Sequence, residues 1–434
     1  MFYWWYKFTR LFYYPLINWI VPLFSKKVRD RICFEAKNFK DPASISFLKT
    51  NEKADFAFEF ASEGELEQVR PLIMKVLSNG RKVELLFSSE SVEHQCEKIY
   101  KIYPKQVRYL RLYLLKYNPL SKSTSLSHWV SSHKLFMCRY DFYPELIQFG
   151  SQKNIEFALL WASTKSFQKV KSKFLLKRFY ENTFHSFDKL VAATPLDHAQ
   201  FIHDLNIKQD QLEVYDFRPV QILKRIESSH SILPIRFNQL DAFKTFLNQV
   251  TLEKRIIYGS FWLDEVKLFK SYDGSEFRHV IVPHKLEQAH AMANELNQLP
   301  WVKALVVDEN TTEDLTQYNT LILNYKGILC ELYPYFSHAY VGNGFGESVH
   351  SLMEPFLANC FVICGPKVHR STEYDLISQS HPDHLHIIHQ MEEFSKCISH
   401  PKNEISSLNS FIQHYKGHYT ATLMWLGIEA EEVW

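Results

Sequence analysis

The sequence predicts an α/β chain with two Rossmann-like domains that face each other across a cleft. Short apolar runs alternate with amphipathic stretches, a pattern typical of parallel sheets covered by helices on both faces. The chain has 434 residues with 46% apolar content, which is enough to bury two separate cores. The predicted strands form two series, 56–60, 83–87, 135–138 and 157–161 in the first and 255–258, 279–282, 304–307, 320–323, 339–341 and 361–364 in the second.

The domain boundaries follow from these two series. We expect a membrane-associated segment over residues 1–44, a first domain over 45–218, a linker over 219–235 and a second domain over 236–434. The net charge of +2 gives no strongly basic balance and argues against a nucleic-acid partner. Seven cysteines without a C-x-x-C pair argue against a zinc site or a disulfide framework and fit a reducing compartment.

The beginning of the chain is predicted to lie in a membrane interface. Residues 2–6 and 11–24 are aromatic and apolar, but two prolines and several polar residues interrupt them. A spanning helix needs about 20 unbroken apolar residues, whereas Trp and Tyr are typical of the headgroup region. The basic cluster at 26–31 suits anionic lipid. The alternative is an aromatic helix packed on the protein's own surface.

A glutamate follows the first predicted strand. The turn Ala61-Ser-Glu-Gly-Glu65 leads into a helical pattern over 65–77, so Glu65 lies at the carboxyl edge of the sheet, where α/β proteins carry catalytic groups. A carboxylate there can accept the proton of an attacking alcohol. The plainer alternative is a glutamate that complements the helix dipole. Glu63 is a second candidate for the base, and its charge would raise the pKa of Glu65.

A glycine-rich turn follows a strand in the second series. Three of the chain's 12 glycines fall within residues 342–346, and Ser351 and Glu354 then have the spacing of a helix-starting capping box. This order leaves backbone N–H groups and a positive helix dipole for a phosphate, so we expect Gly344, Gly346 and Ser351 at an anionic ligand. The alternative is a plain strand-to-helix connection.

Both motifs resemble signatures of the Kdo (3-deoxy-manno-octulosonic acid) transferases of lipopolysaccharide synthesis. Segment 341–354 resembles the family's nucleotide-binding signature, and the 61–65 turn resembles its Ser-x-Gly-Glu loop. The resemblance implies that Glu65 is the catalytic base, that Glu354 contacts the nucleotide ribose and that His350 lies beside the phosphate. The sequence departs from the family pattern at several positions, among them Ser348, Asn359 and Phe361.

Further segments resemble the same family in the same order along the chain. The resemblance implies that Asp141, which stands where the family has Glu, and Arg218 lie at the acceptor. It also implies that Ser260, His284 and Lys285 lie at the nucleotide. The segments concerned are 139–144, 215–218, 259–265 and 283–285.

Basic residues crowd the segment 164–179, and apolar side chains recur there at helical spacing. A basic amphipathic helix suits an anionic membrane surface or a phosphorylated glycolipid. We therefore predict that Lys169 and Lys173 bind the acceptor. The alternative is a solvated helix face above a buried apolar stripe.

The resemblance implies a GT-B glycosyltransferase at the cytoplasmic face of the bacterial inner membrane. It would move Kdo from CMP-Kdo, its donor substrate, to a lipid A precursor with inversion at the anomeric carbon, without a cofactor or a metal. One alternative is a GT-B enzyme that uses another nucleotide sugar. Another is a catalytically silent, membrane-bound relative that binds lipid or partner proteins.

Overall fold

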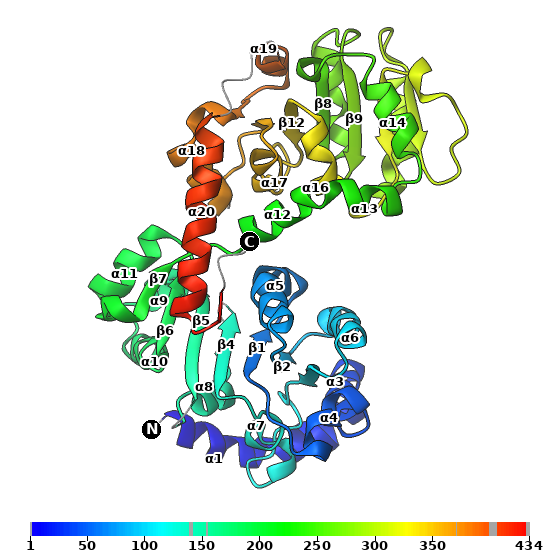
Figure 1. The fold of residues 1–434 in the computed structure, drawn as a ribbon. Coiled ribbons are helices and arrows are strands. Elements are labelled where there is room, and N and C mark those ends of the chain that lie inside the picture. The colour runs from blue at the N-terminus through cyan, green and yellow to red at the C-terminus, as the bar shows by residue number, and fades with distance from the viewer. Residues whose placement is uncertain (1, 139–141, 153–154, 370, 399–405, 431–434) are drawn as a thin grey trace. The chain divides into compact units, whose positions relative to one another are not determined.

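The computed structural model describes residues 2–138, 142–152, 155–369, 371–398 and 406–430 (Figure 1). The chain divides into two compact units. The first comprises Met1–Arg218 and Lys416–Trp434, and the second comprises Pro219–Tyr415. Each unit is built around one seven-stranded sheet, so the two predicted Rossmann-like sheets are present.

The sheet of the first unit is parallel throughout. Its strands are β1 Phe56–Phe60, β2 Val83–Phe87, β3 Val107–Arg111, β4 Lys134–Cys138, β5 Glu156–Ala162, β6 Lys189–Ala192 and β7 Leu212–Val214. They lie in the order β3-β2-β1-β4-β5-β6-β7. All residues of β1 and β2 are buried, as expected for central strands covered on both faces. The four predicted strands correspond to β1, β2, β4 and β5.

Strand β3 escaped prediction because it carries two arginines. Arg108 and Arg111 are only 3% and 2% exposed. Arg108 forms an ion pair with Glu84 of β2, and Arg111 pairs with Glu93 and, at 2.9 Å, with Asp41. Buried charges are tolerated when they are paired in this way. The pairing partners are distant in sequence, so the strand has no apolar run to signal it.

The helices of the first unit carry regular apolar faces. In α5 (Glu63–Ser78), which includes the helix predicted over 65–77, Leu66, Val69, Ile73 and Val76 are buried at the spacing of one helix face. The other helices are α3 Lys26–Ala36, α4 Pro42–Thr50, α6 Glu93–Ile102, α7 Leu126–Trp129, α8 Pro144–Gly150, α9 Lys165–Val170, α10 Phe174–Phe184 and α11 Pro195–Leu205.

The N-terminal segment turns its polar side inward. It consists of α1 (Phe2–Pro15), a π-helical turn (Leu16–Ile20) and α2 (Val21–Phe24). Arg10 donates hydrogen bonds to backbone carbonyls in the 114–117 loop, and Asn18 donates to the Leu115 carbonyl at 2.8 Å. The outward face is apolar and includes Trp4, Trp5, Phe8, Phe12, Trp19, Leu23 and Phe24.

A surface helix normally turns its apolar face inward, whereas here most of the large aromatic side chains are exposed and only Tyr6 packs against the core among the described residues of α1. The helix packs on the protein, as the alternative predicted, and it leaves several aromatic side chains exposed. Binding of this segment to a membrane stays a prediction. No helix among the described residues is long and apolar enough to cross a membrane.

The second unit has the same kind of sheet. Its strands are β8 Arg255–Phe261, β9 Arg278–Pro283, β10 Ala304–Val307, β11 Thr320–Leu323, β12 His338–Val341, β13 Phe361–Cys364 and β14 Leu385–Ile387. All are parallel, in the order β10-β11-β9-β8-β12-β13-β14. The six predicted strands correspond to β8 to β13. Because β9, β8 and β12 are neighbours, the loops that follow them meet at one edge of the sheet.

The helices of the second unit are mostly short. The stretch predicted as a linker lies largely in its first two helices. The helices are α12 Arg218–Glu227, α13 Ser229–Arg236, α14 Leu240–Leu247, α15 Ala289–Leu296, α16 Leu329–Leu332, α17 Met353–Leu357, α18 Thr372–Ser380 and α19 Phe394–Ile398.

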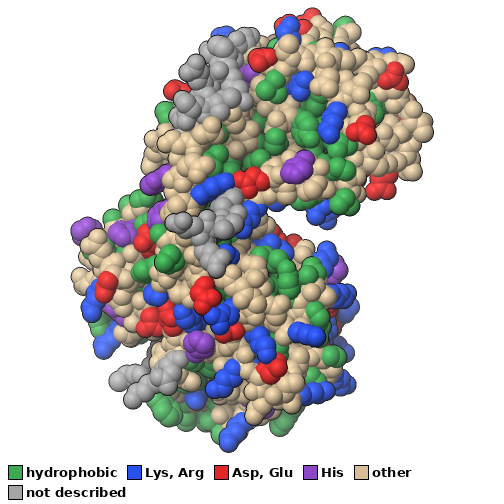
Figure 2. Space-filling view, viewed as in Figure 1, with side chains coloured by type: hydrophobic (Ala, Val, Ile, Leu, Met, Phe, Trp, Pro, Cys, Tyr) green, Lys and Arg blue, Asp and Glu red, His purple; other side chains and the backbone are tan. Residues whose placement is uncertain are grey.

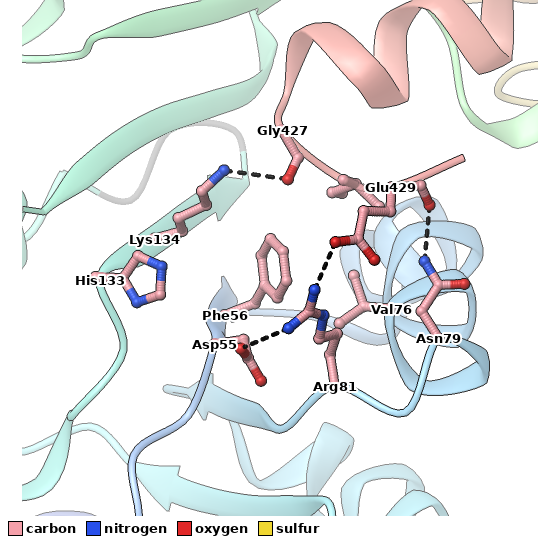
Figure 3. A pocket seen from close by; sticks show the side chains of 10 residues that line it. Asp55, Phe56, Val76, Asn79, Arg81, His133, Lys134, Gly427 and Glu429 are labelled. Atoms are coloured by element: carbon pink, nitrogen blue, oxygen red, sulfur yellow. Dashed lines mark hydrogen bonds and ion pairs between the residues drawn. The ribbon is translucent and has the colours of Figure 1, made fainter. Parts of the chain in front are cut away.

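The end of the chain returns to the first unit through α20 (Ser406–Trp425), a feature for which the sequence offered no signal. Lys134 donates to the Gly427 carbonyl at 3.1 Å, and Asn79 donates to the Glu429 carbonyl at 2.7 Å (Figure 3). Arg81 forms an ion pair with the Glu429 carboxylate. These contacts enclose a cavity of about 190 Å³ at the amino ends of β1 and β4, opposite to the carboxyl edge of the sheet.

Candidate active site

Glu65 lies at the carboxyl edge of the first sheet, at the third position of α5. Ser62 is the N-cap, and its hydroxyl accepts a hydrogen bond from the Glu65 N–H at 3.3 Å. The Glu65 carboxylate in turn accepts the Ala61 N–H at 2.6 Å. This reciprocal pattern is close to a capping box. The structure therefore shows the predicted helix-start role, and it holds the carboxylate at the edge where a catalytic base is expected.

The other candidates in the first unit have different surroundings. Glu63 is exposed at the first position of α5. Arg218 pairs with Asp216 at 2.7 Å and stacks over the Trp161 ring at 4.7 Å, so its side chain is fixed within the first unit. Asp141 lies outside the described residues.

The predicted basic helix over 164–179 is wrong as a single element. It is divided into α9 and α10, and Lys173 takes an extended backbone conformation at the junction. The apolar stripe is divided as well, because Phe167 is fully buried whereas Phe174 is 71% exposed. Lys169 and Lys173 are both exposed. A role for them at the acceptor stays a prediction.

Three aromatic rings stack at the carboxyl edge of the second sheet. His284, which follows β9, lies parallel to Trp262, which follows β8, with 4.7 Å between ring centroids. His350, from the loop after β12, lies 4.4 Å from His284. The Lys285 ammonium lies 5.1 Å from the Trp262 ring centre. The structure thus brings His284, Lys285 and His350 together with Trp262, which was not among the predicted site residues.

The hydrogen bond from Trp262 determines which ring nitrogen of His350 carries the proton. Trp262 Nε1 donates a hydrogen bond to His350 Nε2 at 3.1 Å. Burial, together with the nearby His284, lowers the pKa of His350 to about 4, so the ring is neutral at pH 7. Indole nitrogen is only a donor, and a neutral imidazole has one donor and one acceptor nitrogen. The Nδ1 of His350 therefore carries the proton and offers a donor for an anionic ligand.

Glu265 connects the loops that follow β8 and β12. Its buried carboxylate accepts the Trp262 N–H at 2.9 Å, the Tyr340 hydroxyl at 2.9 Å and the Asn343 N–H at 2.8 Å. Burial raises the pKa of Glu265 to about 7, although these hydrogen bonds oppose the shift. Ser260 and Asn343 have left-handed backbones, with φ of 51° and 68°. Glu265 stabilises these two strained turns next to the stacked rings.

The glycine cluster is required by close packing inside the loop. A Cβ atom on Gly342 would lie 2.3 Å from the Ser260 carbonyl oxygen. One on Gly344 would lie 2.5 Å from the Gly365 nitrogen, and one on Gly346 would lie 2.1 Å from the Asn343 side chain. The three glycines therefore allow the loop to pack against its neighbours. This supports the strand-to-helix alternative and does not test contact with a phosphate.

The predicted capping box of Ser351 and Glu354 is wrong. Helix α17 begins only at Met353, and its N-cap residue makes no side-chain hydrogen bond. The capping group is Glu373 of α18, which accepts the Leu352 N–H at 2.7 Å, the Met353 N–H at 3.0 Å and the Ser351 hydroxyl at 3.1 Å. The spacing of Ser351 and Glu354 predicted the wrong cap because the residue that caps α17, Glu373, lies about 20 residues further along the chain.

Glu354 instead faces Arg225 of α12 at 3.8 Å. Arg225 is also paired with the buried Glu331 at 2.7 Å. Burial raises the pKa of Glu354 to about 7, with Arg225 opposing the shift and the neighbours Glu373 and Glu331 adding to it. A carboxyl group that is easily neutralised can both donate and accept hydrogen bonds, as recognition of a diol requires.

Comparison with known sequences concerns mainly the first unit. The family model for 3-deoxy-D-manno-octulosonic-acid transferase (kdotransferase) matches residues 28–216. The 3-deoxy-D-manno-octulosonic acid transferases of two Chlamydia trachomatis serovars, D and A, are each 26% identical over 200 residues, which cover 45% of this chain and 43% of the relative. The match thus spans less than half the length of these curated relatives.

Comparison with solved structures concerns the fold. The UDP-GlcNAc 2-epimerase from Methanocaldococcus jannaschii overlaps with a TM-score of 0.51 at 10% identity, covering 81% of this chain and 93% of that chain. The C-terminal CMP-Kdo binding domain of WaaA from Acinetobacter baumannii overlaps with a TM-score of 0.30 at 14% identity, covering 43% and 93%, which is too loose to support a statement about ligands. The two parallel sheets and the first likeness assign the fold to the GT-B class. Over residues 28–216, within its first unit, the chain is similar to the Kdo transferase family.

Proposed function

We propose that this protein is an inverting glycosyltransferase that moves Kdo from CMP-Kdo to a lipid A precursor in lipopolysaccharide synthesis. The observation that carries the proposal is the family match over residues 28–216, which includes the Glu65 turn. The stacked rings of the second unit add a polar, partly cationic edge suited to a nucleotide phosphate.

The chemistry assigns a separate task to each unit. A hydroxyl of the acceptor attacks the anomeric carbon of Kdo and gives its proton to the Glu65 carboxylate. The bond from the anomeric carbon to the CMP phosphate oxygen breaks, and that oxygen keeps the electron pair. The ammonium of Lys285 and the Nδ1–H of His350 stabilise the departing phosphate, with the Ser260 turn beside them. Attack opposite to the leaving group inverts the anomeric carbon.

The donor is tested by ligand-induced thermal stabilisation. We expect CMP to raise the unfolding temperature more than UDP or GDP does, because a ligand that binds only the folded state stabilises it by about 2.7 kcal/mol at 100 times its Kd. Trp262→Ala, which removes one ring of the stack and the donor to His350, should reduce this shift, whereas Ile102→Ser on the first unit should not.

Equal or greater stabilisation by UDP would favour a transferase that uses another nucleotide sugar. No stabilisation by any of the three nucleotides would favour a catalytically silent relative. Transfer assayed with CMP-Kdo and a tetra-acylated lipid A precursor then decides whether the bound nucleotide reports an active enzyme.

We also propose that the protein binds the cytoplasmic surface of the inner membrane through its N-terminal segment. The outward face of this segment exposes Trp4 by 75% and Trp5 by 64%. The following basic residues, at 26–31, suit anionic headgroups. Exposed indole rings followed by a cluster of basic residues are usual features of an interfacial segment.

Substitution of Trp4 and Trp5 by Ser is expected to weaken binding to vesicles of mixed zwitterionic and anionic phospholipid. We expect a loss of about tenfold or more per indole, since each carries enough apolar area to contribute more than 1.4 kcal/mol. The matched control is Ile102→Ser, which removes a 68% exposed apolar side chain elsewhere on the first unit. Unchanged thermal unfolding would show that the fold is intact.

Point substitutions test this better than deletion of the segment, because deletion would remove the hydrogen bonds of Arg10 and Asn18 to the 114–117 loop. If the double variant bound vesicles as well as the unchanged protein does, the exposed aromatic face would have to serve another partner.

A further inference from the structure

A groove of about 490 Å³ lies at the carboxyl edge of the first sheet, between α3 and the end of β2. Its lining includes Lys27 and Arg31 from α3, and Ser88, Ser89 and Glu90 from the loop after β2. Phe87 at the end of β2 pairs with Phe60 at the end of β1. Neighbouring strands lie about 4.8 Å apart, so the groove begins one strand away from the turn that carries Glu65.

Two cationic side chains, Lys27 and Arg31, line the groove. Arg31 donates through Nε to Glu35 at 2.8 Å and through Nη1 to the Ser88 carbonyl. Its Nη2 is shielded from solvent and has no hydrogen-bond partner among the described residues. Lys27 lies one helical turn earlier, is exposed and forms no ion pair within the described parts of the chain.

The Glu35 carboxylate, which pairs with Arg31, also accepts hydrogen bonds from backbone N–H groups. Glu35 is fully buried and accepts N–H groups from Leu114, Leu115 and Lys116 at distances of 2.8–3.1 Å. These bonds fix Glu35, and through it Arg31, in place. Figure 2 shows Lys and Arg side chains gathered along the edge of the first unit that carries α3, α4 and α6. The groove therefore favours an anion.

Apolar surface adjoins the groove. Leu23 and Phe24, at the end of α2, are 74% and 86% exposed and precede Lys27 by only three to four residues. Leu115 contributes an apolar wall to the groove itself. A ligand that fills the groove with an anionic group can thus lay hydrocarbon over the exposed end of α2.

We propose that this groove binds a phosphate group of a phosphorylated glycolipid acceptor, held by Lys27 and Arg31, with its acyl chains on Leu23 and Phe24. This inference rests on the proposed function and identifies the phosphate as the feature by which the acceptor is recognised. Glu90 and the Ser89 hydroxyl, which also line the groove, provide hydrogen bonds for sugar hydroxyl groups. The acceptor hydroxyl is then presented to the neighbouring Glu65 turn.

The test compares Lys27→Glu with Lys26→Glu. The two residues are adjacent, exposed and equally charged, but only Lys27 lines the groove. In vesicles of neutral lipid, the measured quantity is the affinity for a bis-phosphorylated, tetra-acylated lipid A precursor, with its dephosphorylated form as the second ligand. We expect Lys27→Glu to weaken binding of the phosphorylated form about tenfold or more relative to Lys26→Glu.

The dephosphorylated form should bind both variants equally. Inorganic phosphate should not compete at millimolar concentration, because it lacks the apolar part of the ligand. If both variants weakened binding equally, the effect would be a general electrostatic attraction and the proposal would be wrong. It would also be wrong if Lys27→Glu weakened binding of the dephosphorylated glycolipid to the same extent. Because binding is measured without CMP-Kdo, failure of transfer would count against the proposed function and leave this result unaffected.

Discussion

Replacement of Glu65 by glutamine is expected to lower the turnover of Kdo transfer about 10²–10⁴-fold, the usual contribution of a general base. Glutamine has nearly the same volume and keeps one oxygen that can accept the Ala61 N–H, so the hydrogen bond that closes the start of α5 survives. It cannot take up the acceptor proton. Thermal unfolding and stabilisation by CMP should therefore change little.

This substitution distinguishes a role of Glu65 as catalytic base from its role as a hydrogen-bond acceptor at the start of α5. If the carboxylate served only the helix start, Glu65→Gln would be nearly silent in turnover, and only Glu65→Ala would be destabilised, by about 1 kcal/mol. Glu63→Gln is the matched control, because Glu63 is exposed two positions earlier. Loss of turnover in the control but not in Glu65→Gln would transfer the role to Glu63. If neither substitution mattered in an active enzyme, Asp141 would be the next candidate.

The fold was predictable where its physical cause is local. Ten strands were found because a parallel strand buried on both faces is a continuous apolar run, as in β1 and β2. β3 was missed because Arg108 and Arg111 are neutralised by Glu84, Glu93 and Asp41, which are far away in sequence. β6, β7 and β14 were also missed, and β7 and β14 are only three residues long, which is too short for a pattern.

The candidate site was predictable only in part for the same reason. His284 and His350 were indicated by a family resemblance, and the sheet order explains why they meet, since β9, β8 and β12 are neighbours. Single residues that act over long sequence distances gave no signal. Glu373 caps α17 from the next helix, and Glu265 joins two loops that are about 80 residues apart.

Only the local contact between Trp262 and Glu265 has a signal in the sequence. Both lie within the segment 259–265 that resembles a family turn, and a Glu three residues after a Trp at the end of a strand has the spacing of a capping pair. The spacing indicates that Glu265 accepts the Trp262 N–H. It cannot indicate the bonds to Tyr340 and Asn343, which depend on the pairing of β12 with β8.

The titration of Glu265 is expected to make the free energy of unfolding depend strongly on pH. Burial raises its folded-state pKa to about 7, above the ordinary value of 4.5 that applies when the chain is unfolded. Between these two values the folded state binds more protons than the unfolded state. The contribution of Glu265 to the free energy of unfolding is therefore fully present below pH 4.5 and is lost as the pH rises through 7, by about 3 kcal/mol.

Glu265→Gln should remove this dependence, because glutamine does not titrate. The measurement is urea-induced unfolding of both proteins at pH 4.5 and pH 8, where the difference in unfolding free energy between them should change by about 3 kcal/mol. Comparison of the two proteins cancels the titration of Glu354 and the other groups that both contain. A difference that does not vary with pH would mean that the donors from Trp262, Tyr340 and Asn343 outweigh burial and keep the carboxylate ionised throughout.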